Sequence, residues 1–165
     1  MDRWEFWIDV GGTFTDCLAR TPDDKLLTCK MLSSGATKGE FQSIDAERSS
    51  FCDPLRQINP ADFWRGYRLT IAEFPDRVWN ITGFDATSGR IYLDQPLPST
   101  LSPLATYEIS SDESAPLLCI RWLLELPLDQ PIPDITVKLG TTRGTNALLE
   151  RKGARVAFVT TQGFG

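Results

Sequence analysis

Five residues near the N-terminus have the types and spacing of a phosphate-binding turn. Asp9 lies in a short apolar run and is followed by Gly11, Gly12 and Thr13, with Thr15 two residues further on. Glycines let backbone N–H groups approach a ligand closely, and a concave row of such groups attracts anions. The threonine hydroxyls add donors, and a carboxylate at the mouth of the turn can hold Mg2+ through water. These groups suit the terminal phosphates of a nucleoside triphosphate, with Asp9 as the candidate catalytic and metal-binding residue.

A hairpin turn that binds nothing is the simpler explanation of the same glycines, because turns of this kind commonly join paired strands. No Gly-Lys-Ser/Thr sequence follows, so the motif is not a Walker A loop. Asp16 also has two open roles. Its carboxylate can contact a metal, or it can fix the hairpin by side-chain to backbone hydrogen bonds, and the structural role is favoured.

A second turn rich in glycine and hydroxyl groups consists of Gly140, Thr141 and Thr142. It lies between a predicted strand and a predicted helix, so its free N–H groups are at the positive end of the helix dipole. Capping of the helix by one threonine explains one hydroxyl without a ligand. Contact with a phosphate explains both hydroxyls, and the two interpretations stay open. Asn146 lies one turn into the helix and is placed to reach the same cleft.

The elements that position these turns follow from periodicity and from turn residues. Apolar and β-branched runs predict strands, and a 3.6-residue apolar period predicts a helix that begins after Ser114. Leu117, Ile120, Leu123 and Leu124 are expected to share its buried face. The last strand is apolar at nearly every position and is therefore expected at the centre of the sheet. The predicted strands are 5–10, 14–20, 26–32, 135–139 and 155–160, and the predicted helices are 115–126 and 142–152.

The segment between the third strand and the first helix has a different pattern. Residues 33–50 are small and polar and predict a loop. Four runs that alternate or carry aromatic residues then predict a small all-β module, and they are 63–71, 77–84, 90–93 and 106–109. An aromatic binding surface is one use for its large rings, but a small barrel needs them for its core. Core packing is favoured, so Trp64, Trp79 and Tyr92 are expected inside.

Composition excludes several classes of protein. The net charge of −5 argues against a nucleic-acid surface. No apolar run approaches the roughly 20 residues of a membrane span, and the N-terminus has no signal-peptide core, so we expect a cytoplasmic protein. The four cysteines form no C-x-x-C pair, and the sequence has no histidine to complete a zinc site. Cys17, Cys29 and Cys119 fall in apolar segments and are expected to be buried thiols.

Two motifs carry a resemblance to known proteins. The sequence around Asp9 resembles the first phosphate loop of the actin-like ATPases. The segment 138–164 resembles the N-terminal domain of the hydantoinase A and 5-oxoprolinase family. Together with the first motif, the resemblance covers residues 4 to about 35 and 115 to 165. One departure is visible, because the family often has His before Gly-Thr-Thr and this chain has Leu139.

The resemblance implies an α/β fold, a ribonuclease-H-like (actin-like ATPase) half-domain with a small all-β insertion. Without the middle block the order is strand, strand, strand, helix, strand, helix, strand, which is similar to the core of that half-domain. Residues 1–39 and 115–165 are then the α/β core, incomplete at its C-terminus, and residues 40–114 are the inserted module.

The resemblance also implies an ATP-dependent hydrolase that opens cyclic amides such as 5-oxoproline or hydantoins, with ATP and Mg2+ as cofactors. Asp9 would steer Mg2+. Phosphate would be bound by Gly11, Gly12, Thr13, Thr15, Gly140, Thr141 and Thr142. The expected partners are the remainder of a longer chain and a hydantoinase B-type subunit or domain, and the fragment alone is expected to be inactive. The alternative is a non-catalytic binding or scaffold module whose β insertion is a partner surface, but Asp9 beside the glycines favours the enzyme.

Overall fold

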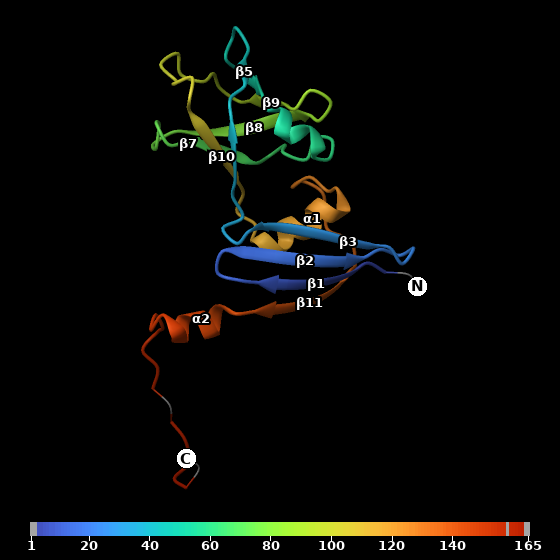
Figure 1. The fold of residues 1–165 in the computed structure, drawn as a ribbon, viewed down its shortest axis with the longest axis vertical. Helices are drawn as coiled ribbons and strands as arrows, with labels where there is room; N and C mark the ends of the chain where they lie inside the picture. Colours follow the sequence, from blue (N-terminus) through green and yellow to red (C-terminus); the bar gives the residue numbers. More distant parts are fainter. Residues whose placement is uncertain (1–2, 158, 164–165) are drawn as a thin grey trace.

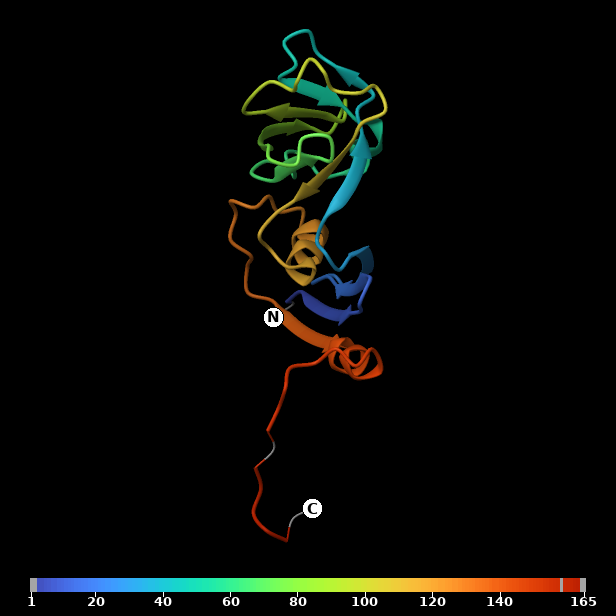
Figure 2. The ribbon, with the colours of Figure 1, turned by 90° about the vertical axis from the view of Figure 1, so that its left-hand side faces the viewer.

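The computed structural model describes residues 3–157 and 159–163, apart from the side chain of residue 143. Two β-sheets follow one another along the long axis of this part of the chain, and a helix lies between them (Figures 1 and 2). Among the described residues one sheet has four strands in the order β11-β1-β2-β3, and the other has seven in the order β4-β10-β7-β8-β9-β6-β5. The mixed α/β class expected from the sequence is therefore observed.

The elements have the following bounds. The four-stranded sheet contains β1 (Glu5–Val10), β2 (Phe14–Arg20), β3 (Leu26–Leu32) and β11 (Thr136–Thr141). The seven-stranded sheet contains β4 (Thr37–Glu40), β5 (Ser43–Ile44), β6 (Ser50–Cys52), β7 (Arg68–Ile71), β8 (Val78–Asp85), β9 (Arg90–Leu93) and β10 (Thr106–Ser110). The helices are the 3-10 helix η1 (Pro54–Ile58), α1 (Ala115–Leu124) and α2 (Arg143–Leu149). No helix among the described residues is long and apolar enough to cross a membrane.

The four-stranded sheet has one covered face and one open face. β1, β2 and β3 form an antiparallel meander, and β11 returns parallel to β1. Phe6, Ile8 and Val10 alternate with exposed or half-buried residues and pack in one cluster with Cys119 and Ile120 of α1. The predicted strands 5–10, 14–20 and 26–32 are confirmed, since local alternation and turn residues were sufficient to define them.

Helix α1 corrects the prediction of a single buried face. Leu118 packs in the core of the seven-stranded sheet, whereas Cys119 and Ile120 pack in the core of the four-stranded sheet. The helix thus buries two faces against two sheets, and Leu117 is left 39% exposed. It ends two residues earlier than predicted, at Leu124, because Glu125 adopts a left-handed backbone with φ 56°.

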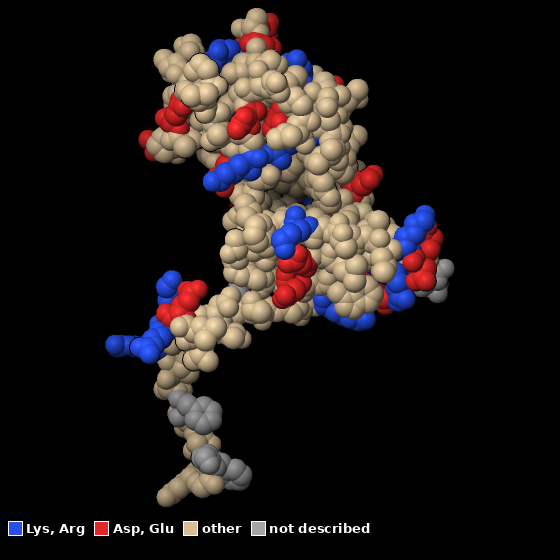
Figure 3. All heavy atoms as spheres, viewed as in Figure 1, with Lys and Arg blue, Asp and Glu red and all other residues tan. Residues whose placement is uncertain are grey.

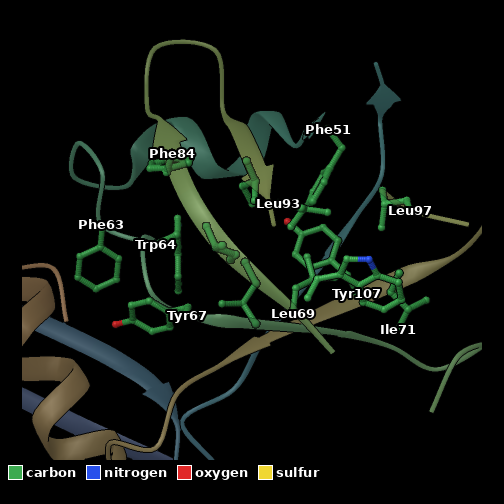
Figure 4. Close-up of a cluster of buried hydrophobic side chains, with 14 of the residues drawn as sticks. Phe51, Phe63, Trp64, Tyr67, Leu69, Ile71, Phe84, Leu93, Leu97 and Tyr107 are labelled. Carbon is green, nitrogen blue, oxygen red and sulfur yellow. The ribbon is translucent and has the colours of Figure 1, made fainter. Parts of the chain in front are cut away.

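The middle block forms the seven-stranded sheet around an aromatic core (Figure 4). The predicted loop 33–50 contains β4 and β5, and the strand predicted over 63–71 begins only at Arg68, after a turn with Gly66 at φ 86°. Trp64 and Trp79 are buried as expected. The expectation for Tyr92 is wrong. It is 43% exposed, because its neighbours in β9 on either side point into the core.

The chain enters and leaves the seven-stranded sheet at one place. β4 and β10 pair antiparallel, with Thr37 opposite Ile109. Just before β4, a Cβ added at Gly35 would lie 3.1 Å from the Leu118 side chain and 3.4 Å from the Glu113 carbonyl oxygen. The domain division at residues 40 and 114 stays a prediction, but the two junctions are close in space.

The predicted central strand over 155–160 is wrong for the residues that the structure describes there. Residues 155–157 and 159–160 have no regular secondary structure, and Phe158 lies outside the described residues. Val156 is 83% and Val159 91% exposed. An apolar run becomes a strand only when another strand pairs with it, and this segment extends away from the sheets (Figures 1 and 2). Helix α2 ends at Leu149, three residues before the predicted end.

Candidate functional site

The two glycine and threonine turns meet at one edge of the four-stranded sheet. β1 and β11 are parallel neighbours, so their carboxyl ends lie side by side. Residues 11–13 follow β1, whereas Gly140 and Thr141, which were predicted in a turn, are the last two residues of β11 and only Thr142 follows the strand. The Thr141 hydroxyl donates to the Val10 carbonyl oxygen at 3.1 Å, and the Thr142 N–H donates to the same oxygen at 3.3 Å. In open α/β sheets ligands bind beyond the carboxyl ends of the strands, which is where these turns lie.

The hairpin glycines are required by close packing. The Gly11 N–H donates to the Phe14 carbonyl oxygen at 3.0 Å, and a Cβ at Gly11 would lie only 2.9 Å from that oxygen. A Cβ at Gly12 would lie 3.3 Å from the Asn146 side-chain nitrogen. Neither glycine has a positive φ. Their lack of a side chain therefore lets β2 and α2 approach the turn, and Asn146 lies at the hairpin tip.

Thr15 holds the turn from behind, a role different from the phosphate contact predicted for it. Its side chain is fully buried on the helix-covered face of the sheet, and its hydroxyl lies 3.0 Å from the Ser33 hydroxyl. Ser33 donates to the Gly11 carbonyl oxygen at 2.9 Å, so Thr15 is left to donate to Ser33. The Ser33 N–H also donates to the Thr13 carbonyl oxygen at 2.9 Å. Gly11, Gly12 and Thr13 remain at the surface.

Ser33 is the supporting residue that the sequence analysis missed. The available signal was register, because Phe14 pairs with Leu32 across β2 and β3. The residue after β3 must then lie beside the hairpin tip, and a small hydroxyl side chain at that position can bond to the turn.

Asp9 lies on the open face of the sheet, where it is exposed. It is directly opposite Asp16 in the β1–β2 register. The Lys30 ammonium on β3 donates to the Asp16 carboxylate at 2.7 Å. Asp16 therefore has a structural partner, although it is a cross-strand lysine rather than the backbone. The Asp9 carboxylate makes no hydrogen bond or ion pair with the residues that the structure describes, so it is available for a ligand.

A shallow depression of about 700 Å³ surrounds Asp9 on this open face. Its lining includes Trp7, Asp16, Lys30 and Lys138, and the Lys138 ammonium lies 4.7 Å from the centre of the Trp7 ring. Figure 3 shows basic and acidic side chains next to each other over this half of the molecule. The face can therefore hold a cation at Asp9 while lysines lie near enough to attract an anionic group.

The described residues fit Mg2+ only with help from water or phosphate. They contain no cluster of three or more His, Cys, Asp or Glu side chains that could hold a metal ion. Mg2+ keeps several of its waters and commonly uses one or two carboxylates plus substrate phosphates. A single accessible carboxylate beside an exposed glycine turn meets that requirement, and Asp9 is the residue that supplies it.

The segment 140–142, which ends β11 and leads into α2, is exposed. Nothing lies within 4 Å of a Cβ placed at Gly140, so close packing does not explain that glycine. Thr142 is the N-cap residue of α2, but its side chain makes no capping hydrogen bond. The Thr142 hydroxyl therefore does not cap α2, which was the alternative to ligand contact.

Comparison with known proteins identifies one matching family. The model described as the hydantoinase/oxoprolinase N-terminal region matches residues 5–58 and 92–165. The unmatched residues 59–91 lie within the seven-stranded sheet and its connections. No solved structure matches this chain.

The similar relatives are much longer proteins. The 5-oxoprolinase of Saccharomyces cerevisiae is 40% identical over 74 residues, which is 39% of this chain and 6% of the relative. The 5-oxoprolinase 1 of Arabidopsis thaliana is 39% identical over 70 residues, which is 37% of this chain and 6% of the relative. An uncharacterised protein of Schizosaccharomyces pombe is 35% identical over 82 residues, which is 44% of this chain and 6% of the relative.

Proposed function

The chain belongs to the hydantoinase/oxoprolinase family, whose N-terminal region it matches, and we propose that it supplies the first phosphate-binding hairpin of an ATP-dependent cyclic-amide hydrolase. The observation that carries this proposal is the meeting of two glycine and threonine turns beside the unpartnered carboxylate of Asp9. The names of the yeast and plant relatives support 5-oxoproline as a substrate to test.

We propose that the four-stranded sheet is the core of a ribonuclease-H-like, actin-like ATPase half-domain. Support comes from the strand order β3-β2-β1-β11, in which β11 is parallel to β1 and α1 lies in the connection between β3 and β11. In this arrangement the turn between β1 and β2 would face the nucleotide.

Cyclic amides are stable, so ring opening needs an activated carbonyl group. ATP, when bound, would supply a phosphoryl group to the amide oxygen with ADP as the leaving group, which would activate the carbonyl carbon so that water can add there and the ring C–N bond can break, with phosphate released by hydrolysis. The exposed backbone of residues 11–13 would bind phosphate, and Asp9 would hold Mg2+ through water. Thr141 would keep the second turn against the first through its bond to the Val10 carbonyl oxygen. Catalysis of this kind depends on positioning and on charge neutralisation.

Further groups are required from outside these residues. The aligned stretches cover only 6 or 7% of the length of the curated relatives. We therefore propose that the remainder of a longer chain, and a hydantoinase B-type subunit or domain, complete the site around the nucleotide and the cyclic amide.

The test is ADP release by the full-length protein, measured with and without Mg2+ and with 5-oxoproline or hydantoin as the second substrate. We expect hydrolysis that requires Mg2+ and is stimulated by one of the cyclic amides. Absence of ATP hydrolysis under all these conditions would contradict the proposal and support a non-catalytic binding module of the same fold.

A further inference from the structure

A second pocket, of about 370 Å³, lies where α1 and the edge strand β3 meet the seven-stranded sheet. Residues 28–30 of β3 border both this pocket and the depression at Asp9, but the other walls differ. The volume falls in the range of small-molecule sites, roughly 300–1,000 Å³. The residues proposed for ATP and Mg2+ do not line it.

Four aromatic side chains from both parts of the fold are among the residues that line it. Phe63, Trp64 and Tyr67 come from the segment before β7, and Trp122 comes from α1. The Phe63 ring lies 5.3 Å from Trp122 and 5.0 Å from Trp64, nearly perpendicular to each. Aromatic walls of this kind suit a flat, apolar ring, which can stack on their faces or contact their edges.

The Tyr67 hydroxyl is a buried polar group without a partner. The side chain is 1% exposed, and its oxygen is the one buried side-chain polar atom among the described residues that makes no hydrogen bond. Figure 4 shows this oxygen pointing away from the other labelled side chains, on the side of the cluster that faces α1. An unmade hydrogen bond at a buried site costs about 1–3 kcal/mol, so an acceptor placed there would be favoured.

The Tyr67 hydroxyl is able to donate throughout the neutral pH range. Burial raises the pKa of Tyr67, and the nearby Glu113 carboxylate raises it further, although Arg121 acts in the opposite direction. The group therefore stays protonated. The oxygen is itself inaccessible, so a ligand's acceptor reaches it only when a side chain of the wall turns, and Trp122 is a half-buried member of that wall.

The charged groups at the pocket are already paired. Arg56 donates to the Tyr107 hydroxyl, the Thr37 hydroxyl and a backbone carbonyl. Lys30 is paired with Asp16. The Asn59 side-chain oxygen accepts from the Trp64 indole at 2.6 Å. A charged ligand would have to displace one of these bonds, so the pocket favours an uncharged one.

We propose that this pocket binds a small, uncharged, planar ring that carries a hydrogen-bond acceptor, with the ring against the aromatic walls and the acceptor at the Tyr67 hydroxyl. Leu55 and Ile58 of η1 also line the pocket and are strongly exposed, which extends an apolar entrance. Because Trp122 belongs to α1 and Phe63 to the segment before β7, a bound ring would contact both of these parts of the chain.

The test uses three probes of one shape: quinoline, which has an acceptor nitrogen, naphthalene, which has none, and N-methylquinolinium, which is a cation. Binding is followed by the indole N–H signals of the five tryptophans in a two-dimensional NMR titration of the 165-residue chain. We expect quinoline to shift the signals of Trp64 and Trp122 and to leave Trp7, on the open face, unchanged. Shifts at Trp7 alone, or no shift up to the solubility limit, would overturn the proposal.

The variant Tyr67→Phe removes the hydroxyl and little else, and Tyr92→Phe is the matched control at an exposed tyrosine outside the pocket. Quinoline should bind the wild type about three- to tenfold more tightly than naphthalene, and Tyr67→Phe should abolish that preference while Tyr92→Phe keeps it. The cation should bind more weakly than either probe. A preference that survives Tyr67→Phe, or tighter binding of the cation, would contradict the proposal.

The melting temperature without any probe gives an independent measurement. If the hydroxyl is unpartnered, Tyr67→Phe leaves the melting temperature unchanged or raises it, because no hydrogen bond is lost. A fall of more than about 4 °C would mean that the hydroxyl is already bonded and would overturn the proposal.

Discussion

Asp9 is the residue on which the proposed chemistry depends most directly, because its carboxylate has no partner among the described residues. In the full-length protein, Asp9→Asn should lower ATP turnover by roughly 100-fold or more, since a metal contact contributes several kcal/mol to charge stabilisation. The melting temperature should change little, because the side chain is exposed. Steady-state ADP release measures the effect.

The matched control for Asp9 is Asp76→Asn, which removes one negative charge from an exposed turn beside the seven-stranded sheet. Its turnover should stay within about twofold of the wild type, because surface charges far from a site are screened. Near-normal turnover of Asp9→Asn would remove this residue from the mechanism, and an equal loss in both variants would point to net charge instead.

Ser33 tests whether the hairpin turn is held from behind. Ser33→Ala would leave the buried Thr15 hydroxyl without its partner and free the Gly11 carbonyl oxygen, so stability should fall by about 1–3 kcal/mol. Urea unfolding measures this loss, and the exposed Ser99→Ala is the control, expected within about 0.5 kcal/mol of the wild type. Adding Thr15→Val to Ser33→Ala should recover part of the loss. No recovery would show that the two hydroxyls act separately.

At the scale of elements, α1 joins two hydrophobic cores, and two adjacent leucines separate its buried and exposed sides. Leu118 is 4% exposed and packs against the seven-stranded sheet, whereas Leu117 is 39% exposed. Leu118→Ala should lower the free energy of unfolding by about 2–5 kcal/mol, because it leaves a cavity in the core of the seven-stranded sheet. Leu117→Ala should cost less than about 1 kcal/mol, and equal losses in chemical denaturation would contradict the two-core description.

Local patterns predicted the elements well where neighbours in sequence decide the structure. β1, β2 and β3 agree with the sequence prediction because turn residues and alternating burial define their ends. The strand predicted around Val156 is not observed, because a strand needs a pairing partner that no local sequence pattern reveals. The prediction for Tyr92 was wrong because either face of β9 could point into the core, and only packing against the other strands decides which face does. Strand formation and side-chain facing thus depend on residues far away in the sequence.

The candidate site was predicted in its parts but not in all of its contacts. The residue types alone were sufficient to predict a turn at the glycines and a candidate metal-binding carboxylate at Asp9. Thr15 has the same residue type as Thr13, but Thr13 lies in the turn before β2 begins and is exposed, whereas Thr15 lies in β2 on the face that the helix covers. The Tyr67 hydroxyl could not have been foreseen, because its lack of a partner depends on how α1 packs against the seven-stranded sheet.

At the scale of the whole molecule, the chain enters and leaves the seven-stranded sheet through one pair of strands, β4 and β10, which makes its removal feasible. Gly35 lies against Glu113, and β4 pairs with β10, so a short Gly-Ser bridge can replace residues 37–110. We expect the four-stranded sheet and α1 to remain folded, because their core from Phe6 to Ile120 is separate from the removed core. Cooperative urea unfolding and the amide signals of β1 and β2 measure the outcome.

Deletion of the seven-stranded sheet would uncover apolar side chains of α1. It exposes Leu118 and Trp122, which pack against the removed aromatic cluster, so the shortened chain should associate at high concentration. A second shortened variant with Leu118→Gln and Trp122→Gln should be monomeric by sedimentation and should unfold cooperatively. If neither shortened chain unfolds cooperatively, the four-stranded sheet cannot fold without the seven-stranded sheet. The division of the chain into a core and an inserted module would then be wrong.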